Sequence, residues 1–295
     1  MSNKLFSGIM PALITPIDEK GHLKEACAVD IIERLLSRGV DGFYANGATG
    51  EGLFLSEQTR RENAQAAVAV CRGRAKVINH VGAVDALEAL RLARHSAEIG
   101  CDAISSLIPN YIRKYTVDQI LDYYRQLHLE SGLPVLVYCT NLVGSDPYEF
   151  MRRAMEVEGV IGCKYTLSDY YSMQRITELN GGDVNVINGP DEMLICGLTM
   201  GADGGIGSTY NLMPERFLRL FKAFREGRFE DARREQAGIN RVISVLLSHD
   251  CIPAIKQTFT YLGYPAGNIA YPGKVFDAEE AHTLICELKK AGLEI

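Results

Sequence analysis

The chain has 295 residues, of which 47% are hydrophobic, so it can bury a sizeable core as two domains or as one large α/β barrel. Its 31 basic and 37 acidic side chains are mixed along the sequence without a basic run, which argues against a nucleic-acid or anionic membrane partner and favours a small molecule. We find neither a signal-peptide core nor an apolar run of membrane-spanning length, and therefore expect a soluble, cytoplasmic protein.

Short apolar runs alternate with longer amphipathic stretches from residue 8 onward, which is typical of repeated βα units around a parallel sheet. The stretches between the runs are predicted helices, such as 116–130 and 168–179, the second with Ser168 as its N-cap. Eight such units predict a TIM (β/α)8 barrel. The predicted strands cover residues 8–15, 42–46, 76–81, 103–108, 134–139, 160–166, 185–188 and 204–208.

A helical extension follows the eighth predicted helix, which begins at Pro214 and ends near Gly227. Its helices are predicted over residues 229–248, 252–262 and 278–291. Because no linker rich in Gly, Ser or Pro separates the two parts, we expect the extension to pack on the barrel. The predicted organisation is a barrel over residues 1–227 and a C-terminal helical extension over residues 228–295.

The eight cysteines occur one at a time, without the C-x-x-C pairs of zinc sites or the density of a disulfide scaffold. We therefore expect reduced structural thiols. The six histidines fall mostly in predicted helices or away from strand ends, so we predict no bound metal.

Lys164 is the one charge in V-I-G-C-K-Y-T, residues 160–166, near the end of the sixth predicted strand. Functional groups of such barrels lie at the C-terminal ends of the strands, and alternation places Gly162, Lys164 and Thr166 on one face. Apolar walls disfavour the charged form of an amine, and a neutral amine can form an imine with a carbonyl substrate. The alternative is a strand-end lysine that reaches solvent or a carboxylate such as Asp169.

Tyr138 closes the fifth predicted strand, P-V-L-V-Y-C, on the same face as Pro134 and Leu136. A phenol beside the amine of Lys164 could relay protons. A buried core tyrosine explains the same pattern.

The loop after the second predicted strand, N-G-A-T-G-E-G at residues 46–52, is rich in glycine and precedes a helix predicted to begin at Ser56. Its N–H groups and the Thr49 hydroxyl are suited to hold a carboxylate or a phosphate, as oriented amides do in anion-binding nests. An ordinary tight turn between a strand and a helix is the alternative.

Two adjacent carboxylates, Asp191 and Glu192, follow the seventh predicted strand in N-G-P-D-E at residues 188–192. They suit the hydroxyl groups of a polyol, which donate hydrogen bonds, or a metal ion with further ligands. The alternative is that they stabilise a helix N-terminus.

The segment G-A-D-G-G-I-G-S-T-Y-N, residues 201–211, is so rich in small residues that a ligand can approach its backbone closely. Alternation along the predicted strand puts Ser208 on one face with Ile206 and Tyr210. A phosphate-binding loop is an equally good interpretation, because many barrels hold phosphate after their last two strands.

Together, N-G-A-T-G-E-G, the lone lysine of G-C-K-Y-T, G-P-D-E and G-A-D-G-G-I-G-S-T-Y-N resemble the N-acetylneuraminate lyase family. That family belongs with dihydrodipicolinate synthase to a group of Schiff-base aldolases, and the likeness covers nearly the whole chain. The last two motifs look like the lyase branch. The synthase branch usually carries an arginine shortly after the tyrosine that corresponds to Tyr138, whereas C-T-N-L-V-G follows it here.

The resemblance implies that Lys164 forms an imine with C2 of a 2-keto acid and that Tyr138 shuttles protons. Tyr111, in I-P-N-Y after the fourth predicted strand, matches a tyrosine that members of the group lend to a neighbouring subunit's site, which implies a homotetramer. Substrate-binding positions carried over in the same way are Ala48, Thr49 and Gly50 for the carboxylate, and Thr166, Gly189, Asp191, Glu192 and Ser208 for the sugar tail.

The implied reaction cleaves N-acetylneuraminate or a similar 2-keto sugar acid to pyruvate and an aldose such as N-acetylmannosamine. The amine attacks C2, and the iminium accepts electrons while the C4 hydroxyl loses its proton and the C3–C4 bond breaks. Protonation and hydrolysis of the enamine release pyruvate. The resemblance implies no metal or organic cofactor.

Two departures from the family pattern bear on the substrate. Ala48 stands where the family usually has Ser or Thr, and its side chain cannot take part in the proton relay that this hydroxyl completes. The family's Y-N-x-P is Y-C-T-N here, which changes a loop beside the substrate tail. Besides a sugar-acid lyase, we therefore keep a Schiff-base aldolase, dehydratase or hydratase acting on another 2-keto acid, a non-catalytic keto-acid-binding barrel, and a phosphate-ligand barrel enzyme.

Overall fold

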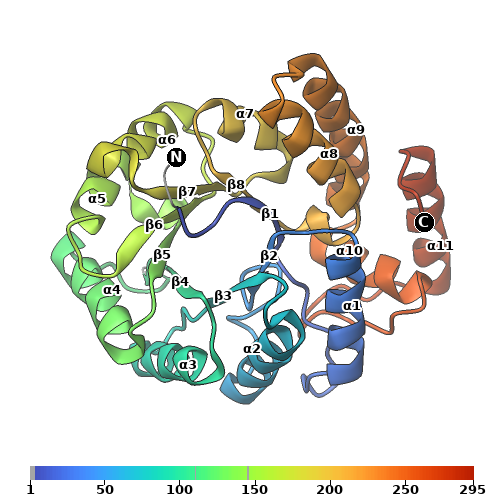
Figure 1. Ribbon diagram of the computed structural model, residues 1–295. Coiled ribbons are helices and arrows are strands. Elements are labelled where there is room, and N and C mark those ends of the chain that lie inside the picture. The colour runs from blue at the N-terminus through green and yellow to red at the C-terminus, as the bar shows by residue number, and fades with distance from the viewer. Residues whose placement is uncertain (1–3, 110, 145) are drawn as a thin grey trace.

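The computed structural model describes residues 4–109, 111–144 and 146–295, in which eight parallel strands form a ring surrounded by helices (Figure 1). Each strand from β2 to β8 pairs with the next along the chain, and β8 pairs with β1. The predicted (β/α)8 barrel is thereby confirmed. The strands are β1 (Gly8–Pro11), β2 (Gly42–Ala45), β3 (Lys76–His80), β4 (Ala103–Leu107), β5 (Val135–Cys139), β6 (Val160–Tyr165), β7 (Asn185–Asn188) and β8 (Gly204–Gly207).

The ring closes between β1 and β2 through a few contacts instead of a continuous ladder. Ala12 forms an isolated parallel bridge with Tyr44, and the N–H of Leu13 donates to the carbonyl of Tyr44 at 2.9 Å. The predicted first strand, 8–15, was too long, because the chain turns from β8 toward β2 after Pro11. The second and eighth strands also end one residue early, where the backbone leaves the extended conformation at Asn46 and Ser208.

Helices cover the outside of the ring, and five of the eight that follow the strands are capped at the N-terminus by a Ser, Thr or Asp side chain. The helix predicted to begin at Ser56 starts there, with Ser56 as its N-cap accepting the N–H of Thr59 at 3.1 Å. The cap of α6 is Asp169 and not Ser168, because the Asp169 carboxylate accepts the N–H of Ser172 at 3.0 Å. The helices are α1 (Glu25–Ser37), α2 (Glu57–Cys71), α3 (Ala86–Ile99), α4 (Val117–Ser131), α5 (Pro147–Ala154), α6 (Tyr170–Thr177), α7 (Leu194–Thr199) and α8 (Pro214–Arg225).

The extension adds α9 (Phe229–Ser248), α10 (Cys251–Tyr261) and α11 (Ala278–Lys290), which lie beside α8 and α1 in Figure 1. All of them share one apolar cluster with these two barrel helices, to which Ile31, Phe217, Ile239, Phe259 and Leu288 belong. The expected packing of the extension on the barrel is therefore present, whereas a domain boundary at residue 227 stays a prediction. None of the helices in the described ranges has the length and apolar character needed to cross a bilayer.

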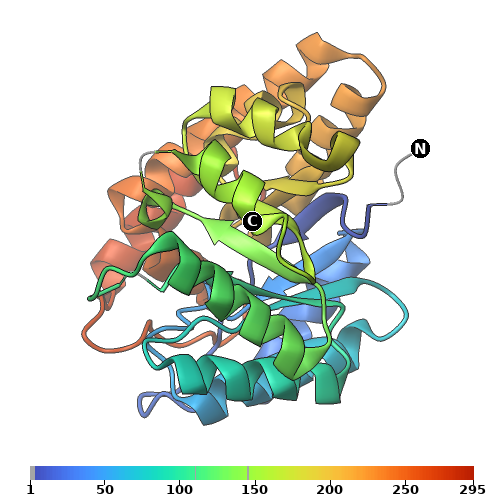
Figure 2. The same cartoon turned by 90° about the vertical axis from the view of Figure 1, so that its left-hand side faces the viewer.

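The barrel interior holds a cluster of its own, which includes Met10, Ile78, Leu136 and Ile206 at the centre of the ring. The strands point toward one side of the molecule. In Figure 2 the green strand arrow points to the side on which the orange and red segment after α10 lies, and the N-terminus lies on the other. The loops after the strands therefore lie on the side of the molecule where the extension passes.

Candidate active site

Lys164 lies near the end of β6, beside Tyr138 of β5, with which it is in register. Only 4% of Lys164 is exposed, so it does not reach solvent, and the predicted alternative partner Asp169 is occupied as a helix cap. Its Nζ lies 4.4 Å from the ring centre of Tyr44 and 4.3 Å from that of Tyr138. The amine is thus held between two aromatic faces inside the barrel.

Tyr44 and His80, which the sequence did not single out, complete an aromatic wall around this amine. The ring centres of His80 and Tyr138 lie 6.0 Å apart and those of Tyr44 and Tyr138 6.1 Å apart, in edge-to-face arrangements. The Tyr44 hydroxyl donates to Ser105 Oγ at 3.0 Å. Both residues come from interior-facing positions near the ends of β2 and β3, and this position in the strand is the signal that could have identified them.

His80 is fixed in one neutral form, because both ring nitrogens have backbone partners. Nδ1–H donates to the carbonyl of Asn46 at 3.1 Å, and Nε2 accepts the N–H of Leu107 at 3.1 Å. Burial, together with the charges of Arg60 and Lys164, lowers the pKa of His80 to about 3. The imidazole therefore shapes the site and does not serve as its general base.

The glycine-rich loop after β2 is bounded by two residues in the left-handed region, Asn46 with φ of 56° and Glu51 with φ of 57°. The Asn46 side chain donates to the Arg60 carbonyl and to Asn79 Oδ1, both at 2.9 Å. The Thr15 hydroxyl donates to the Gly50 carbonyl at 2.7 Å. Side chains from other segments thus hold this loop, which we call the substrate loop (residues 46–51), in one conformation.

Thr49 and Ser208 join the substrate loop to the segment after β8, since their hydroxyl oxygens lie 2.7 Å apart. They border a cavity of about 170 Å³ at the barrel opening. The substrate loop, which was predicted to hold the carboxylate, and the predicted imine-forming Lys164 therefore face the same cavity. The lining residues are Ala48, Thr49, Tyr138, Lys164, Thr166, Gly189, Ile206, Gly207, Ser208 and Ile252.

Thr166 and Gly189 lie in direct contact at the cavity wall. A Cβ at Gly189 would lie 1.9 Å from Thr166 Oγ1, so only glycine fits there. Thr166 Oγ1 is buried and has no hydrogen-bond partner among the described residues. Because an unpaired buried hydroxyl costs free energy, this oxygen is a ready partner for a hydroxyl group of a ligand.

Asp191 lies directly behind the cavity wall, since a Cβ at Gly207 would lie 1.9 Å from its Oδ1. Its Oδ2 accepts the N–H of Thr209 at 2.7 Å and the Thr209 hydroxyl at 2.6 Å. Burial raises the pKa of Asp191 to about 6, although these hydrogen bonds oppose the shift. Glu192, by contrast, is exposed.

The predicted shared face of Ile206, Ser208 and Tyr210 is wrong. Ile206 lies in the barrel interior, whereas Tyr210 belongs to the cluster between the barrel and the helices. The backbone of Ser208 is already helical, with φ of −69° and ψ of −44°, so alternation stops at Gly207. Ser208 nevertheless reaches the cavity, because this turn directs it toward Thr49.

Tyr111 packs against the interior cluster of its own chain and does not line the cavity. Its hydroxyl is buried without a hydrogen-bond partner among the described residues, and burial raises the pKa of this phenol. Asn110, also part of the I-P-N-Y motif, lies outside the described residues. Gly50 belongs to the substrate loop but is not among the residues that line the cavity.

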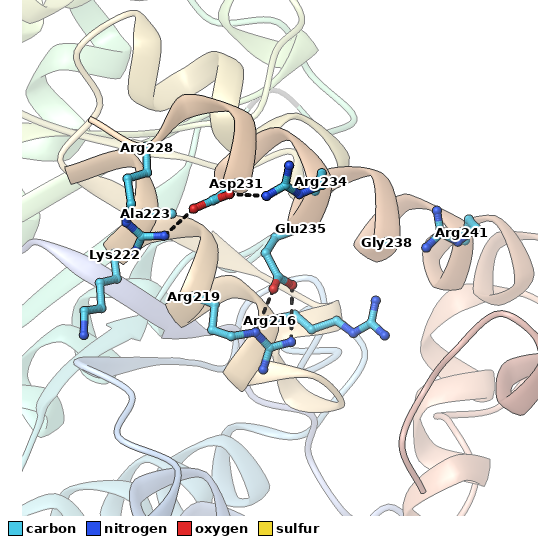
Figure 3. A pocket seen from close by; sticks show the side chains of 10 residues that line it. All are labelled: Arg216, Arg219, Lys222, Ala223, Arg228, Asp231, Arg234, Glu235, Gly238 and Arg241. Carbon is cyan, nitrogen blue, oxygen red and sulfur yellow. Dashed lines mark hydrogen bonds and ion pairs between the residues drawn. The ribbon is translucent and has the colours of Figure 1, made fainter. Parts of the chain in front are cut away.

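A larger hollow of about 600 Å³ lies between α8 and α9, away from the barrel opening (Figure 3). Its side chains are mainly arginines, and acidic neighbours bind several of them. Glu235 accepts two hydrogen bonds from Arg219, and Asp231 lies between Arg228 and Arg234. It contains none of the groups predicted to react. Among the described residues, no group of three His, Cys, Asp or Glu side chains is placed to hold a metal ion.

Comparison with known proteins finds relatives over nearly the whole chain. Residues 5–291 match the dihydrodipicolinate synthetase family. The N-acetylneuraminate lyase of Rhizobium meliloti (strain 1021) is 35% identical over 278 residues, which are 93% of this chain and 92% of that protein.

Solved structures agree with the sequence matches. Proteus mirabilis N-acetylneuraminate lyase superimposes with a TM-score of 0.93 at 28% identity, covering 99% of this chain and 100% of that one. A catalytic lysine mutant of Ruminococcus gnavus sialic acid aldolase superimposes with a TM-score of 0.89 at 26% identity, covering 97% of each chain.

Proposed function

Because the chain belongs to the dihydrodipicolinate synthetase family, we propose that it is a class I aldolase, a carbon–carbon lyase that cleaves a sialic-acid-like 2-keto sugar acid to pyruvate and an aldose such as N-acetylmannosamine. The observation that carries this proposal is the amine of Lys164, buried between two tyrosine rings at the end of β6 in a cavity that also contains Tyr138 and the substrate loop. The relatives that match over most of the chain are N-acetylneuraminate lyases, and one of them was solved as a catalytic lysine mutant.

In the first step the neutral amine of Lys164 attacks C2 of the keto acid. The carbinolamine loses water and leaves an iminium. The substrate loop orients this step, since its backbone N–H groups and the Thr49 hydroxyl bind the carboxylate next to C2. The aromatic wall of Tyr44, His80 and Tyr138 keeps water away from the nitrogen.

Tyr138 donates its proton to the hydroxyl that leaves the carbinolamine as water, and it becomes a phenolate. In the second step this phenolate takes the proton of the C4 hydroxyl, directly or through the substrate carboxylate, and the C3–C4 bond breaks. The bonding electrons move into the iminium and form an enamine, while C4 leaves as the aldehyde of the aldose. The enamine takes a proton at C3, and water hydrolyses the imine to release pyruvate. This sequence of steps uses no metal and no organic cofactor.

The remainder of the sugar acid binds at the other end of the cavity. The unpaired hydroxyl of Thr166 forms a hydrogen bond with a hydroxyl of the substrate. Ser208 contacts the carbon chain of the sugar acid at the point where it lies beside Thr49. Asp191 lies behind the wall and acts on this end indirectly, by holding the turn at Thr209 next to Ser208. The exposed Glu192 accepts a hydrogen bond from the outermost hydroxyl. A structure with the substrate bound tests these contacts.

A second candidate, a Schiff-base enzyme for another 2-keto acid, is favoured by the apolar part of the wall. Ala48, Ile206 and Ile252 line the cavity without a polar side-chain atom, and Y-C-T-N replaces the family's usual sequence after β5. A panel of 2-keto acids with polyhydroxylated and apolar tails separates the two candidates by kcat/KM.

We also propose that the protein is a cytoplasmic homotetramer. The loop after β4 carries Tyr111, whose hydroxyl is buried but unpaired among the described residues, and next to it Ile112, which is 88% exposed. An exposed isoleucine beside a site residue suits a contact between subunits.

The test of the proposed function is borohydride reduction in the presence of pyruvate, followed by mass spectrometry of the peptide that contains residue 164. We expect a stable adduct on Lys164 and none in Lys164→Met. A folded protein that forms no adduct at saturating pyruvate contradicts both aldolase candidates and leaves a binding protein.

A further inference from the structure

A buried ion pair joins the substrate loop to the helical extension across 205 positions of sequence. Lys256 Nζ lies 2.6 Å from Glu51 Oε1, and the two side chains are 1% and 8% exposed. Lys256 also donates to the Asn268 carbonyl at 2.9 Å, and Glu51 Oε2 accepts the N–H of Ala270 at 2.5 Å. Every partner of this pair outside the substrate loop therefore belongs to α10 or to the segment that follows it.

Stability alone is a poor reason for such a pair. Taking two charges out of water costs about as much as their attraction returns, and apolar residues of similar size often serve as well. Burial lowers the pKa of Lys256, and the Glu51 carboxylate opposes this shift. An ion pair with two additional hydrogen bonds does, however, fix the position of the side chains that form it, here that of Glu51.

The residue held in this way is one whose backbone is strained. Glu51 has φ of 57°, which a residue with a Cβ adopts at a cost, and its N–H donates to the Ala48 carbonyl at 3.0 Å. Its conformation therefore sets the turn that presents Ala48 and Thr49 to the cavity. A carboxylate that slips from this position releases the turn.

The same face of α10 contributes to the cavity itself. Ile252 lines the cavity, and Lys256 lies four residues later, one helical turn along the same side. The extension thus supplies one wall of the site and, next to it, the anchor of the loop that forms another wall.

We propose that Lys256 is a positioning residue, which acts through Glu51 to hold the substrate loop where its N–H groups meet the carboxylate of the 2-keto acid. This inference deepens the proposed function and rests on it for the identity of the ligand. It gives the extension a role in substrate binding.

The test compares Lys256→Met, Glu51→Gln and the variant carrying both. Single variants leave one buried charge unpaired and destabilise the fold, whereas the double variant leaves none and regains stability. We expect the pyruvate concentration for half-maximal borohydride trapping on Lys164 to rise about tenfold or more in the double variant, because the loop has lost its anchor. A double variant with wild-type unfolding temperature and wild-type half-saturation would overturn the proposal.

Lys4→Met is the matched control, since Lys4 forms a partly buried pair with Asp203 at 2.8 Å, beside the first residue of β8 and so at the end of the barrel away from the substrate loop. We expect it to lower stability without changing the half-saturation for pyruvate. A rise equal to that of the double variant would mean that any loss of a buried pair has this effect, and the proposal would fail.

Hydrogen exchange separates this inference from the proposed function. Without any ligand, the amides of residues 46–52 are expected to exchange faster in the double variant than in the wild type and in Lys4→Met. If the wild type traps no pyruvate, the proposed function fails while this measurement still decides the role of Lys256. Unchanged exchange in the double variant contradicts that role.

Discussion

At the scale of single residues, the site contains groups that take part in the proposed reaction, such as Lys164, and groups that only form its walls, such as His80. Lys164 lies against the faces of Tyr44 and Tyr138, which attract it when it is charged and shield it when it is neutral. His80 is adjacent, but both of its nitrogens are bonded to the backbone. Proton transfer in this site is therefore left to hydroxyl and carboxyl groups.

Asp191 gives a pH-dependent prediction. Its folded pKa of about 6 lies above the ordinary value of 3.8, so the folded protein binds the extra proton between these values and loses stability as pH rises through them. Asp191→Asn removes this loss. Relative to the wild type, we expect the free energy of unfolding of Asp191→Asn to increase by on the order of 3 kcal/mol between pH 3.5 and 7.5.

Urea denaturation at several pH values measures this difference. Glu192→Gln is the comparison, because the Glu192 charge helps to raise the Asp191 pKa, and removing it should reduce the pH-dependent loss without abolishing it. A pH-independent difference for Asp191→Asn would show that its carboxyl group is not perturbed in the fold.

Sequence reasoning reached Lys164, Tyr138, Thr49 and Ser208 because each stands near the end of an apolar run or in a glycine-rich loop, where a barrel places its chemistry. It missed Lys256, whose partner lies 205 positions away, since nothing local in I-P-A-I-K distinguishes a buried ion pair from a helix-surface lysine. Contacts between distant segments set these roles, and a single sequence does not display them.

At the scale of elements, β6 carries the irregularity that aims the lysine. Val135 pairs with Val160 and Leu136 with Gly162, so Ile161 is an extra residue in the ladder. Gly162 has φ of 151°, and a Cβ there would lie 1.9 Å from the carbonyl oxygen of Asn185. The close approach of β7 therefore requires glycine two residues before Lys164.

Gly162→Ala is expected to cost at least about 3 kcal/mol of stability or to prevent folding, because the new methyl group meets backbone atoms that cannot turn aside. Gly73→Ala is the comparison, since Gly73 has φ of 72° but nothing within 4 Å of the added atom. Its cost should be only about 1–2 kcal/mol, from the backbone conformation alone. Equal losses in urea unfolding would show that the contact with β7 is not tight.

The number and order of the strands could be predicted because each is a short apolar run between amphipathic stretches. The ends of the strands could not be predicted, because they depend on backbone conformations that the apolar runs do not indicate. The first strand stops at Pro11 where the chain turns toward β2, and the eighth stops where Ser208 becomes helical. The bulge at Ile161 is also invisible in V-I-G-C-K-Y-T, where the pattern is unbroken.

At the scale of the whole molecule, the loop after β4 places an exposed apolar side chain beside a buried hydroxyl group. Ile112 is 88% exposed and follows Tyr111, whose hydroxyl lies buried and unpaired among the described residues. A subunit contact at this loop would bury the Ile112 side chain and give the Tyr111 hydroxyl a hydrogen-bond partner.

Ile112→Glu should weaken the proposed tetramer, because a carboxylate would be buried at the contact. Light scattering after size-exclusion chromatography measures the molar mass, and we expect four chains in the wild type and fewer in the variant. Leu87→Glu, at an apolar side chain on α3 that is 64% exposed, should leave the mass unchanged. A monomeric wild type contradicts the proposal outright.

The link between Glu51 and Lys256 also has a consequence for the order in which the protein is made. A chain synthesised only as far as β8 contains every strand of the barrel, with Lys164 and the substrate loop, but not yet α10. If the anchor works as proposed, such a nascent chain has its nucleophile and still holds keto acids poorly. Tight keto-acid binding would then appear only after α10 has been made, and chains terminated between β8 and α10 would bind keto acids weakly.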